Sequence, residues 1–420
     1  MLSARASAKD KCMIIRGYVE CKECSFQHVI RIGMGLESQQ RHRFACHSCH
    51  EDIEVGLDVD YQNISAVIFY GENTREIDPV SDSPIVNIDA NFIIPDDLKG
   101  KDFAFPRLEQ GAKMVQKIIE MRREKGLPDF PLGEALKRSG RPNFAEEWND
   151  CRAAWSLFRN GKNDLTNKRI ARASATTYQD DPLTDMADWA WRIAARLTQP
   201  AFEQHFLDGM AQLREAQKNQ DYQRFVLTYK GELSVSHGRM FFELLRGYFA
   251  SFDEFAQVFF LVTSGTEFPN GTAASSNFDA VRMFYGNAFE GFSSGVEFLA
   301  YMNNLVAGRR FDEFQTMSRS DYLKLDKSSR FNCFAENQAF NAIAIESDNT
   351  LRNASHHGDF HFDKQSQQIS YRAGKGGQGE QNQITYTEYL RRSTVLFVQA
   401  MVLFRLELVF ASNAGIRPPL

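Results

Sequence analysis

A short stretch near the C-terminal end of the chain gathers side chains that can carry out acid–base chemistry on a phosphate. It reads LRNASHHGDF, spans residues 351–360 and contains Arg352, Asn353 and His357. Cleaving RNA without a metal needs a base for the 2′-hydroxyl proton, an acid for the leaving 5′-oxygen and a cation for the charge at phosphorus. His357 titrates near neutrality and can serve as base or acid. Arg352 offers a permanent forked cation, and Asn353 can orient either group or the ribose.

A purely structural role for the same stretch is the alternative. His356 can line a helix face four residues after Arg352. His357 can cap the last carbonyl groups of a helix, and Asp359 can pair with Arg352. Residues five apart on an ideal helix differ by about 140° in direction, so Arg352 and His357 share a face only if the helix ends between them, as Gly358 suggests. Spacing alone does not decide, because two further R-x4-6-H matches overlap a cysteine pair.

Four cysteines form a second candidate site with the pattern C-x2-C, 21 residues, C-x2-C. They are Cys21, Cys24, Cys46 and Cys49. In a chain whose first residues lack a secretory apolar run, this pattern indicates a metal site rather than disulfides. Two turns that present four thiolates suit a tetrahedral structural Zn²⁺. Because four thiolates fill the coordination shell and leave no position for a catalytic water, the predicted zinc is structural.

Haem is the alternative for the second cysteine pair. The segment CHSCH at residues 46–50 matches the C-x-x-C-H attachment signature of c-type haem. Haem attachment belongs to exported proteins and would leave the first cysteine pair unexplained, so zinc is the better prediction. His47 and His50 can replace a zinc ligand or remain exposed residues of the turn.

The elements that must position the cysteines are β-strands. Both cysteine pairs lie between extended apolar stretches, and Ile53, Val55 and Leu57 alternate with polar or small residues. Further strand-like runs occur at residues 65–70 and 84–94. The turn signals of IPDDLKG then place a domain boundary near residue 100.

Helices are predicted to position the arginine–histidine stretch. Residues 101–230 read as an all-helical middle domain, and residues 231–420 contain four long helical candidates and a β-hairpin at 368–373 and 382–387. The fold class is α+β, with domains at 1–100, 101–230 and 231–420. In the candidate 331–357, the residues Phe340, Ile343, Ser347, Leu351 and Ala354 keep the spacing of one helix face, which places the stretch on its last turns. The four candidates are 239–263, 278–306, 331–357 and 386–410.

Composition favours a globular protein of two or three domains. The chain has 420 residues, of which 43% are hydrophobic and 25% charged. Residues 51–100 hold 12 acidic against 2 basic residues, whereas 101–175 hold 16 basic against 10 acidic residues. We expect a cytoplasmic protein without membrane insertion, because Gln399, Arg405 and Glu407 interrupt the apolar C-terminal helix. Signatures of phosphate loops, Rossmann folds and zinc proteases are absent, which disfavours those enzyme classes.

Residues 351–361 resemble the R-x4-6-H motif of the HEPN superfamily, in which the motif lies at a helix end and a polar residue often follows the arginine. The surrounding set of four helices with a hairpin and a last apolar helix, over residues 231–420, resembles HEPN-like proteins of abortive infection. The resemblance implies a metal-independent RNA endonuclease with catalytic Arg352, Asn353 and His357, acting as a homodimer in phage defence or in a toxin-like role with partner subunits. His356 and His361 are secondary candidates. An upstream acidic–basic companion motif, which some members carry, is not found.

The cysteine segment, roughly residues 12–60, resembles zinc ribbons, which commonly bind nucleic acids or proteins. A second hypothesis is therefore a non-catalytic binding protein with the same fold, in which Arg352 and His357 are not needed for turnover. A third hypothesis is a structural subunit of a larger assembly that docks through the basic residues 101–175.

Overall fold

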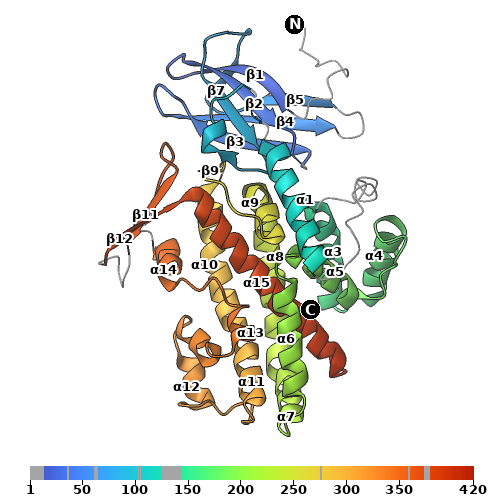
Figure 1. Cartoon of the computed structure of the whole chain (residues 1–420). Coiled ribbons are helices and arrows are strands. Elements are labelled where there is room, and N and C mark those ends of the chain that lie inside the picture. Colours follow the sequence, from blue (N-terminus) through green and yellow to red (C-terminus); the bar gives the residue numbers. More distant parts are fainter. Residues whose placement is uncertain are drawn as a thin grey trace. The chain divides into compact units, whose positions relative to one another are not determined.

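The computed structural model describes residues 14–420, apart from residues 36, 61–64, 103, 105, 125–143, 275–276, 358–359 and 373–378. The side chains of residues 106–109 and 357 also lie outside the described part of the chain. The fold is α+β: a β-rich N-terminal region holds the four cysteines, mostly helical segments follow, and a small sheet lies near the C-terminus (Figure 1). The predicted fold class is therefore confirmed.

Two small sheets form the N-terminal region. In the described residues, one sheet has the strand order β6-β1-β2-β7 and the other the order β3-β4-β5. Strands β2 and β7 are parallel, and the other neighbouring pairs are antiparallel. The bounds are β1 Ile14–Cys21, β2 Gln27–Gly33, β3 Gln39–Ala45, β4 Asp52–Asp60, β5 Ser65–Tyr70, β6 Thr74–Glu76 and β7 Ile85–Asp89.

One apolar core joins these two sheets. Val19 and Ile30 from the first sheet belong to the same buried cluster as Ile53, Val55 and Leu57 from β4. The three β4 residues are fully buried, while the neighbouring acidic side chains are partly or fully exposed. The predicted alternation along this strand is therefore confirmed, and it explains why the sheet has one apolar face.

Helices make up most of the chain after residue 105, in agreement with the predicted helical middle segment. A short strand β8 (Ile94–Pro95), which pairs with β9 (Gly271–Thr272), and a 3₁₀ turn η1 (Asp96–Leu98) precede them. The helices are α1 Pro106–Glu124, α3 Phe144–Arg159, α4 Asn163–Thr176, α5 Met186–Thr198, α6 Glu203–Ala216, α7 Tyr222–Thr228, the π-helical turn η2 Tyr229–Leu233, α8 Ser234–Ala250, α9 Phe252–Ser264, α10 Phe278–Gly295, α11 Glu297–Val306, α12 Arg319–Lys324, η3 Ser329–Phe334, α13 Gln338–Asn341, α14 Asn349–His357 and α15 Tyr386–Asn413.

Three of the four long helices predicted for the C-terminal part are interrupted. The predicted helix 239–263 divides into α8 and α9 at Ser251, and 278–306 divides into α10 and α11 at Val296. The prediction of one helix over 331–357 is wrong, because this segment contains the 3₁₀ helix η3, the short helix α13, a non-helical stretch at 344–348 and α14.

Polar side chains explain why the segment 331–357 is broken. Asn337 Oδ1 accepts the Phe340 N–H at 3.3 Å and so begins α13, and Asp348 Oδ1 accepts the Leu351 N–H at 3.0 Å and so begins α14. Between them, the buried Gln399 amide of α15 makes two hydrogen bonds with the backbone of Glu346, at 2.9 and 2.8 Å. Phe340, Ile343, Leu351 and Ala354 are buried as predicted but are not on one continuous helix, and Ser347 of the same predicted face is exposed.

The chain folds into two compact units, each assembled from three separate segments. Helices α10, α14 and α15 contribute residues to both units, so neither unit is one continuous stretch of sequence. The boundaries predicted near residues 100 and 230 stay predictions. The first unit comprises Met1–Phe130, Ser251–Arg282 and His357–Arg391, and the second comprises Pro131–Ala250, Met283–His356 and Arg392–Leu420.

A three-stranded antiparallel sheet follows α14. Its strands are β10 (Phe360–Asp363), β11 (Gln368–Arg372) and β12 (Gln381–Thr385), in the order β10-β11-β12. The predicted hairpin corresponds to β11 and β12 and is confirmed. Strand β10 is an addition, whose alternation of half-buried Phe360 and Phe362 with exposed residues is too short to stand out in the sequence.

Helix α15 is long and apolar enough to cross a membrane by length and composition, but 94% of its most apolar 18-residue window is buried inside the structure. Two charged residues within it are fully buried and paired. Arg405 Nη1 lies 2.8 Å from a Glu203 carboxylate oxygen, and Glu407 Oε1 lies 2.9 Å from His237 Nδ1. The prediction of a buried helix is therefore confirmed.

Candidate metal centre and candidate active site

Each cysteine pair lies on a tight turn, and the two turns have equivalent geometry. The Ser25 N–H donates to the Cys21 carbonyl at 2.9 Å, and the His50 N–H donates to the Cys46 carbonyl at 3.0 Å. Ser25 and His50 directly follow the second cysteine of their pairs and have left-handed φ angles of 59° and 64°. The sequence therefore builds the same turn twice, and each turn presents two thiols.

The four sulfur atoms of these turns come together. Cys21 Sγ lies 3.7 Å from Cys49 Sγ, and Cys24 Sγ lies 3.6 Å from Cys46 Sγ, so each short contact joins one turn to the other. All four sulfurs lie within 4.8 Å of one another. Four thiolates about 2.3 Å from a tetrahedral zinc ion would be about 3.8 Å apart. The cluster can hold a metal ion, and in the described part of the chain its ligand set consists of these cysteines without His47 or His50.

Asn73 supports the first cysteine turn from a distant part of the sequence. Its Nδ2 donates to Cys21 Sγ at 3.4 Å and to the Asp52 carbonyl at 3.0 Å, while its Oδ1 accepts the Glu23 N–H at 3.1 Å. The amide thus ties the first turn to the start of β4. Groups that hydrogen-bond metal ligands orient them and tune their charge. Sequence reasoning missed Asn73, whose one signal is the turn GENT between two strand-like runs.

Buried His28 supports the second turn. Its Nε2 accepts the His47 N–H at 3.3 Å, which requires a neutral ring on that side. Burial, with a smaller contribution from His47, lowers the pKa of His28 to about 4, in keeping with that role. At the first turn, the Phe26 backbone N–H lowers the pKa of Cys24 to about 7, whereas burial raises the pKa of Cys46 at the second turn.

Polar contacts fix the start of α14. Asp348, which caps the helix through Leu351, also accepts Arg392 Nη1 at 2.7 Å. The neighbouring Glu346 accepts the Tyr285 hydroxyl at 2.7 Å, and burial raises the pKa of this carboxyl group. Since Tyr285 lies in α10 and Arg392 in α15, the first turn of α14 is held between these two helices.

Arg352 and Asn353 are brought together on α14. Arg352 Nη1 donates to Asn353 Oδ1 at 2.6 Å, and Nη2 forms an ion pair with Glu290 of α10. The side chains of Arg352 and Glu290 are 23% and 32% exposed, so the pair remains accessible to water. Partial burial lowers the pKa of the Arg352 guanidinium, which remains a cation at neutral pH. The arrangement offers one cation, its carboxylate partner and one amide.

The histidines of the stretch have different surroundings. A Cβ atom added to Gly286 of α10 would lie 2.6 Å from His356 Nε2, so the His356 ring packs directly on the α10 backbone. Helix α14 ends at His357, whose side chain lies outside the described residues, as do Gly358 and Asp359. The catalytic role of His357 stays a prediction. His361 is exposed on β10.

Two carboxylates near α14 were not predicted as site residues. Glu290 pairs with Arg352, and Glu346 precedes α14. Gly286 and Glu290 are one helical turn apart and contact His356 and Arg352, which are also one turn apart. The spacing of Gly286 and Glu290 in GNAFEG was therefore the available signal, but nothing in the sequence alone links it to α14.

Comparison with known proteins identifies no relative of this chain. No protein family model, no curated protein and no solved structure matches the chain. The cysteine cluster in a β-rich region is consistent with a zinc ribbon.

Proposed function

We propose that the chain is a metal-independent RNA endonuclease of HEPN type, in which α14 carries the catalytic residues Arg352, Asn353 and His357. The observation that carries this proposal is the hydrogen bond between Arg352 and Asn353, at 2.6 Å, on a helix that ends at His357. A small sheet and the apolar helix α15 follow in the chain, an order that resembles HEPN proteins. A role in phage defence, or as a toxin with partner subunits, follows from this resemblance.

The reaction joins the 2′-oxygen of RNA to phosphorus and breaks the bond from phosphorus to the 5′-oxygen. One histidine removes the 2′-hydroxyl proton, and another group protonates the leaving 5′-oxygen, which yields a 2′,3′-cyclic phosphate and a 5′-hydroxyl. Arg352 stabilises the charge that develops on the phosphate, and Asn353 holds the guanidinium in place. A two-fold homodimer, as HEPN proteins typically form, would supply two copies of His357 for the two proton transfers.

Glu290 is the group with which an RNA phosphate would compete. Its ion pair with Arg352 is partly exposed, and such pairs contribute at most about 1 kcal/mol. A phosphate can therefore replace the carboxylate at little cost in free energy. In the absence of RNA, Glu290 keeps the guanidinium on the α10 side of the helix, so substrate binding and the release of Arg352 are coupled.

A structural zinc ion is the metal that best suits the cysteine cluster. The four sulfurs are soft donors, and their separations of 3.6 and 3.7 Å across the two turns match a tetrahedral shell. When bound, the ion joins the two turns and supplies folding free energy to the β-rich region, as in zinc ribbons. The chemistry at α14 does not use it.

A non-catalytic binding protein is the second candidate, and two observations favour it. Glu290 already neutralises Arg352, and the His356 ring is packed against Gly286 rather than turned toward a substrate. In that case the arginine and histidine of the stretch hold α14 on α10. The zinc module would then provide the recognition.

The first test is RNA cleavage by the zinc-loaded wild-type protein in buffer without added magnesium or other divalent ions, beside Arg352→Ala and His357→Ala. We expect wild type to produce 2′,3′-cyclic phosphate ends, and both variants to lose this activity by at least about 100-fold, the usual scale for an acid–base group. Arg246→Ala and His205→Ala remove the same residue types from the second unit and should cut like wild type. Folding and oligomeric state are checked by circular dichroism and size-exclusion chromatography.

Cleavage that persists in Arg352→Ala and His357→Ala would refute the proposed site. The second candidate would then take its place.

A further inference from the structure

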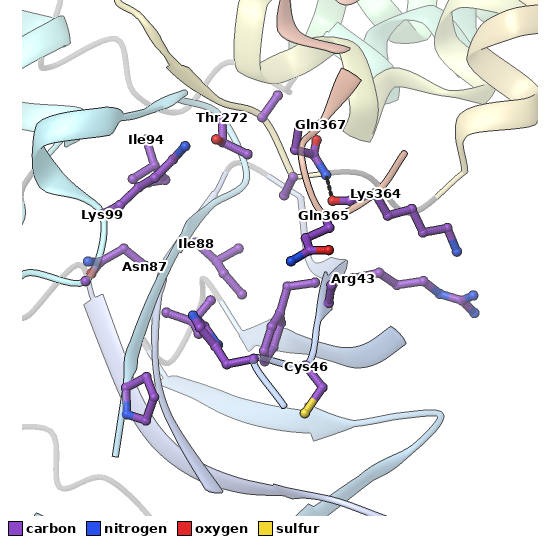
Figure 2. A pocket seen from close by; sticks show the side chains of 18 of the residues that line it. Arg43, Cys46, Asn87, Ile88, Ile94, Lys99, Thr272, Lys364, Gln365 and Gln367 are labelled. Atoms are coloured by element: carbon purple, nitrogen blue, oxygen red, sulfur yellow. Dashed lines mark hydrogen bonds between the residues drawn. The ribbon is translucent and has the colours of Figure 1, made fainter. Parts of the chain in front are cut away.

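Two adjoining cavities lie beside the second cysteine turn, within the first compact unit. Their volumes are about 680 and about 350 Å³, sizes typical of ligand sites. Arg43, Phe44, Lys364 and Gln367 line both cavities, so the two spaces share one wall. The larger cavity is bounded by residues 43–50, by residues 84–88 and by the turn between β10 and β11 (Figure 2).

Positive charge dominates the larger cavity. Lys99 lies on one side, and Arg43 and Lys364 lie on the opposite side with their charged ends turned outward, as Figure 2 shows. None of the described residues that line this cavity is an aspartate or a glutamate. This is unexpected by composition, because residues 51–100 carry 12 acidic against 2 basic residues. The acidic side chains of the region are thus kept off the cavity walls, which favours an anionic ligand.

The cations of the shared wall have carboxylate partners that a ligand can replace. Arg43 Nη2 lies 3.2 Å from a Glu72 carboxylate oxygen, and Lys364 forms an ion pair with Asp52. The Glu72 and Lys364 side chains are 71% and 56% exposed, whereas those of Arg43 and Asp52 are 35% and 23% exposed, and Arg43 Nη2 also lies 3.7 Å from a Glu54 carboxylate oxygen. Ion pairs that reach the surface contribute about 1 kcal/mol or less, so phosphate oxygens can compete with these carboxylates.

The turn that carries Lys364 is held in a fixed shape. Asp363 accepts the Gln365 N–H at 2.9 Å and the Ser366 hydroxyl at 2.8 Å. Gln367 Nε2 donates to the Lys364 carbonyl at 2.9 Å, drawn as the dashed line in Figure 2, and Gln367 has a left-handed φ of 55°. A turn with this many internal bonds presents its side chains without further ordering, which favours binding.

Aromatic rings continue from the shared wall into the smaller cavity. Phe44 belongs to the wall itself, and Phe278, Phe360 and Phe362 line the smaller cavity beyond it. These four rings are half-buried, so each keeps an exposed part. The Phe278 and Phe362 rings are stacked on each other with their centroids 4.6 Å apart, so a base would use the ring surface that Phe362 turns away from Phe278. Aromatic rings beside cations provide stacking surfaces for bases next to sites for phosphates.

We infer that these adjoining cavities bind a segment of single-stranded RNA, with a phosphate on Arg43 and Lys364 and bases against Phe44 and Phe362. A single strand fits better than a duplex, because stacking on these rings requires unpaired bases. Asp52 and Asp279 also line the smaller cavity, so the phosphate belongs at the shared wall rather than deeper in that space. The inference rests on the proposed function for the choice of RNA, and it names where the substrate is recognised.

Binding of an uncleavable strand tests this site separately from catalysis. The probe is a fluorescent single-stranded 2′-O-methyl RNA of roughly ten nucleotides, a length within the range of such sites. The double variant Arg43→Gln/Lys364→Gln should bind at least about tenfold more weakly than the wild-type full chain. Its plot of log affinity against log salt should flatten by about 0.7, since the two cations hold one phosphate and each lost phosphate contact contributes about 0.7.

Arg75→Gln is the matched control. It removes an exposed cation of the same unit that lines neither cavity, and it should bind like wild type. Phe362→Leu keeps an apolar side chain in place but removes the stacking surface, and it should weaken binding by about fivefold or more without changing the salt slope. Each variant is compared after its unfolding transition has been matched to wild type.

The other results would overturn the inference. Unchanged affinity in the double variant excludes these cations from RNA binding. Adenosine monophosphate that competes as well as the strand indicates a free-nucleotide site, and preference for a duplex of the same sequence excludes stacking on the phenylalanines. Since the probe cannot be cleaved, tight binding without RNA cleavage would retain this site and reject only the proposed endonuclease.

Discussion

Asn73 and Glu290 are the polar partners of the charged or ionisable groups at the two candidate sites. The Asn73 amide donates to a sulfur of the cysteine cluster, and the Glu290 carboxylate pairs with the guanidinium of Arg352. Hydrogen bonds to metal-bound thiolates spread their negative charge, and a carboxylate beside an arginine keeps the cation fixed until an anion replaces it. Asn73 and Glu290 are each more than 50 residues away in sequence from the residue that they contact.

Removing the Asn73 amide should weaken metal binding without removing a ligand. We expect Asn73→Ala to bind zinc about tenfold or more weakly, because it loses both the bond to Cys21 and the bond that ties the turn to β4. Competition against a chromophoric chelator measures this affinity. Lys22→Ala, which alters an exposed side chain in the same turn, is the control. Equal affinities of Asn73→Ala and wild type would mean that the amide has no part in metal binding.

The packing of α14 on α10 determines what the arginine–histidine stretch can do. Gly286 and Glu290 are one turn apart on α10, and they contact His356 and Arg352, one turn apart on α14. Gly286 lets the imidazole ring lie directly on the backbone of α10. The two helices therefore meet along a short polar seam, with a glycine where a larger residue would separate them.

Gly286→Ala should separate the two helices. The added Cβ would lie 2.6 Å from His356 Nε2 and 2.8 Å from its Cδ2, so the ring must move. We expect a loss of about 1–3 kcal/mol in the free energy of unfolding, the usual scale for overpacking, measured by urea denaturation. The control is Gly111→Ala in α1, where a Cβ meets no atom within 4 Å and should stabilise the helix by about 0.5–1 kcal/mol. A Gly286→Ala protein as stable as the control would contradict the close packing.

Apolar spacing predicted burial around α14 better than it predicted the helix itself. Phe340, Ile343 and Leu351 are buried, as their spacing suggested, yet they belong to elements that two caps and a side-chain contact separate. The decisive contact comes from Gln399, more than 50 residues away, which binds the backbone of Glu346. Local periodicity cannot reveal such a partner, because it encodes which side chains face the core and not what the backbone bonds to.

Buried ionic groups join distant segments of the second compact unit. His237 of α8 faces Glu407 of α15 at 2.9 Å and Glu297 of α11 at 3.4 Å, and the Tyr229 hydroxyl donates to Glu407 at 2.6 Å. Burial alone would lower the pKa of His237, but the Glu407 and Glu297 carboxylates outweigh burial and raise it to about 10. A protonated histidine thus links three helices inside an apolar core.

The stability of this unit should depend on pH through His237. Its pKa is raised from 6.5 to about 10 by folding, so its contribution is fully present below about pH 6.5 and is lost as the pH rises toward 10. Between pH 6 and 10, the unfolding free energy of wild type should therefore fall more than that of His237→Gln. Denaturant titrations at a series of pH values measure the difference. Parallel curves for the two proteins would show that the histidine is not charged in the folded state.

The sequence by itself determined the four-cysteine cluster, the α+β class, the alternation in β4, the hairpin of β11 and β12 and the buried C-terminal helix. Each of these depends on residue types at short fixed spacing, which local geometry enforces. Only the tertiary structure decided that Asn73 supports the cysteine turn, that Glu290 holds Arg352, and that Lys364 joins Arg43 in one cationic wall. These contacts join residues that are remote in sequence. The charge at each candidate site depends on such contacts, because electrostatic interactions act through space and not along the chain.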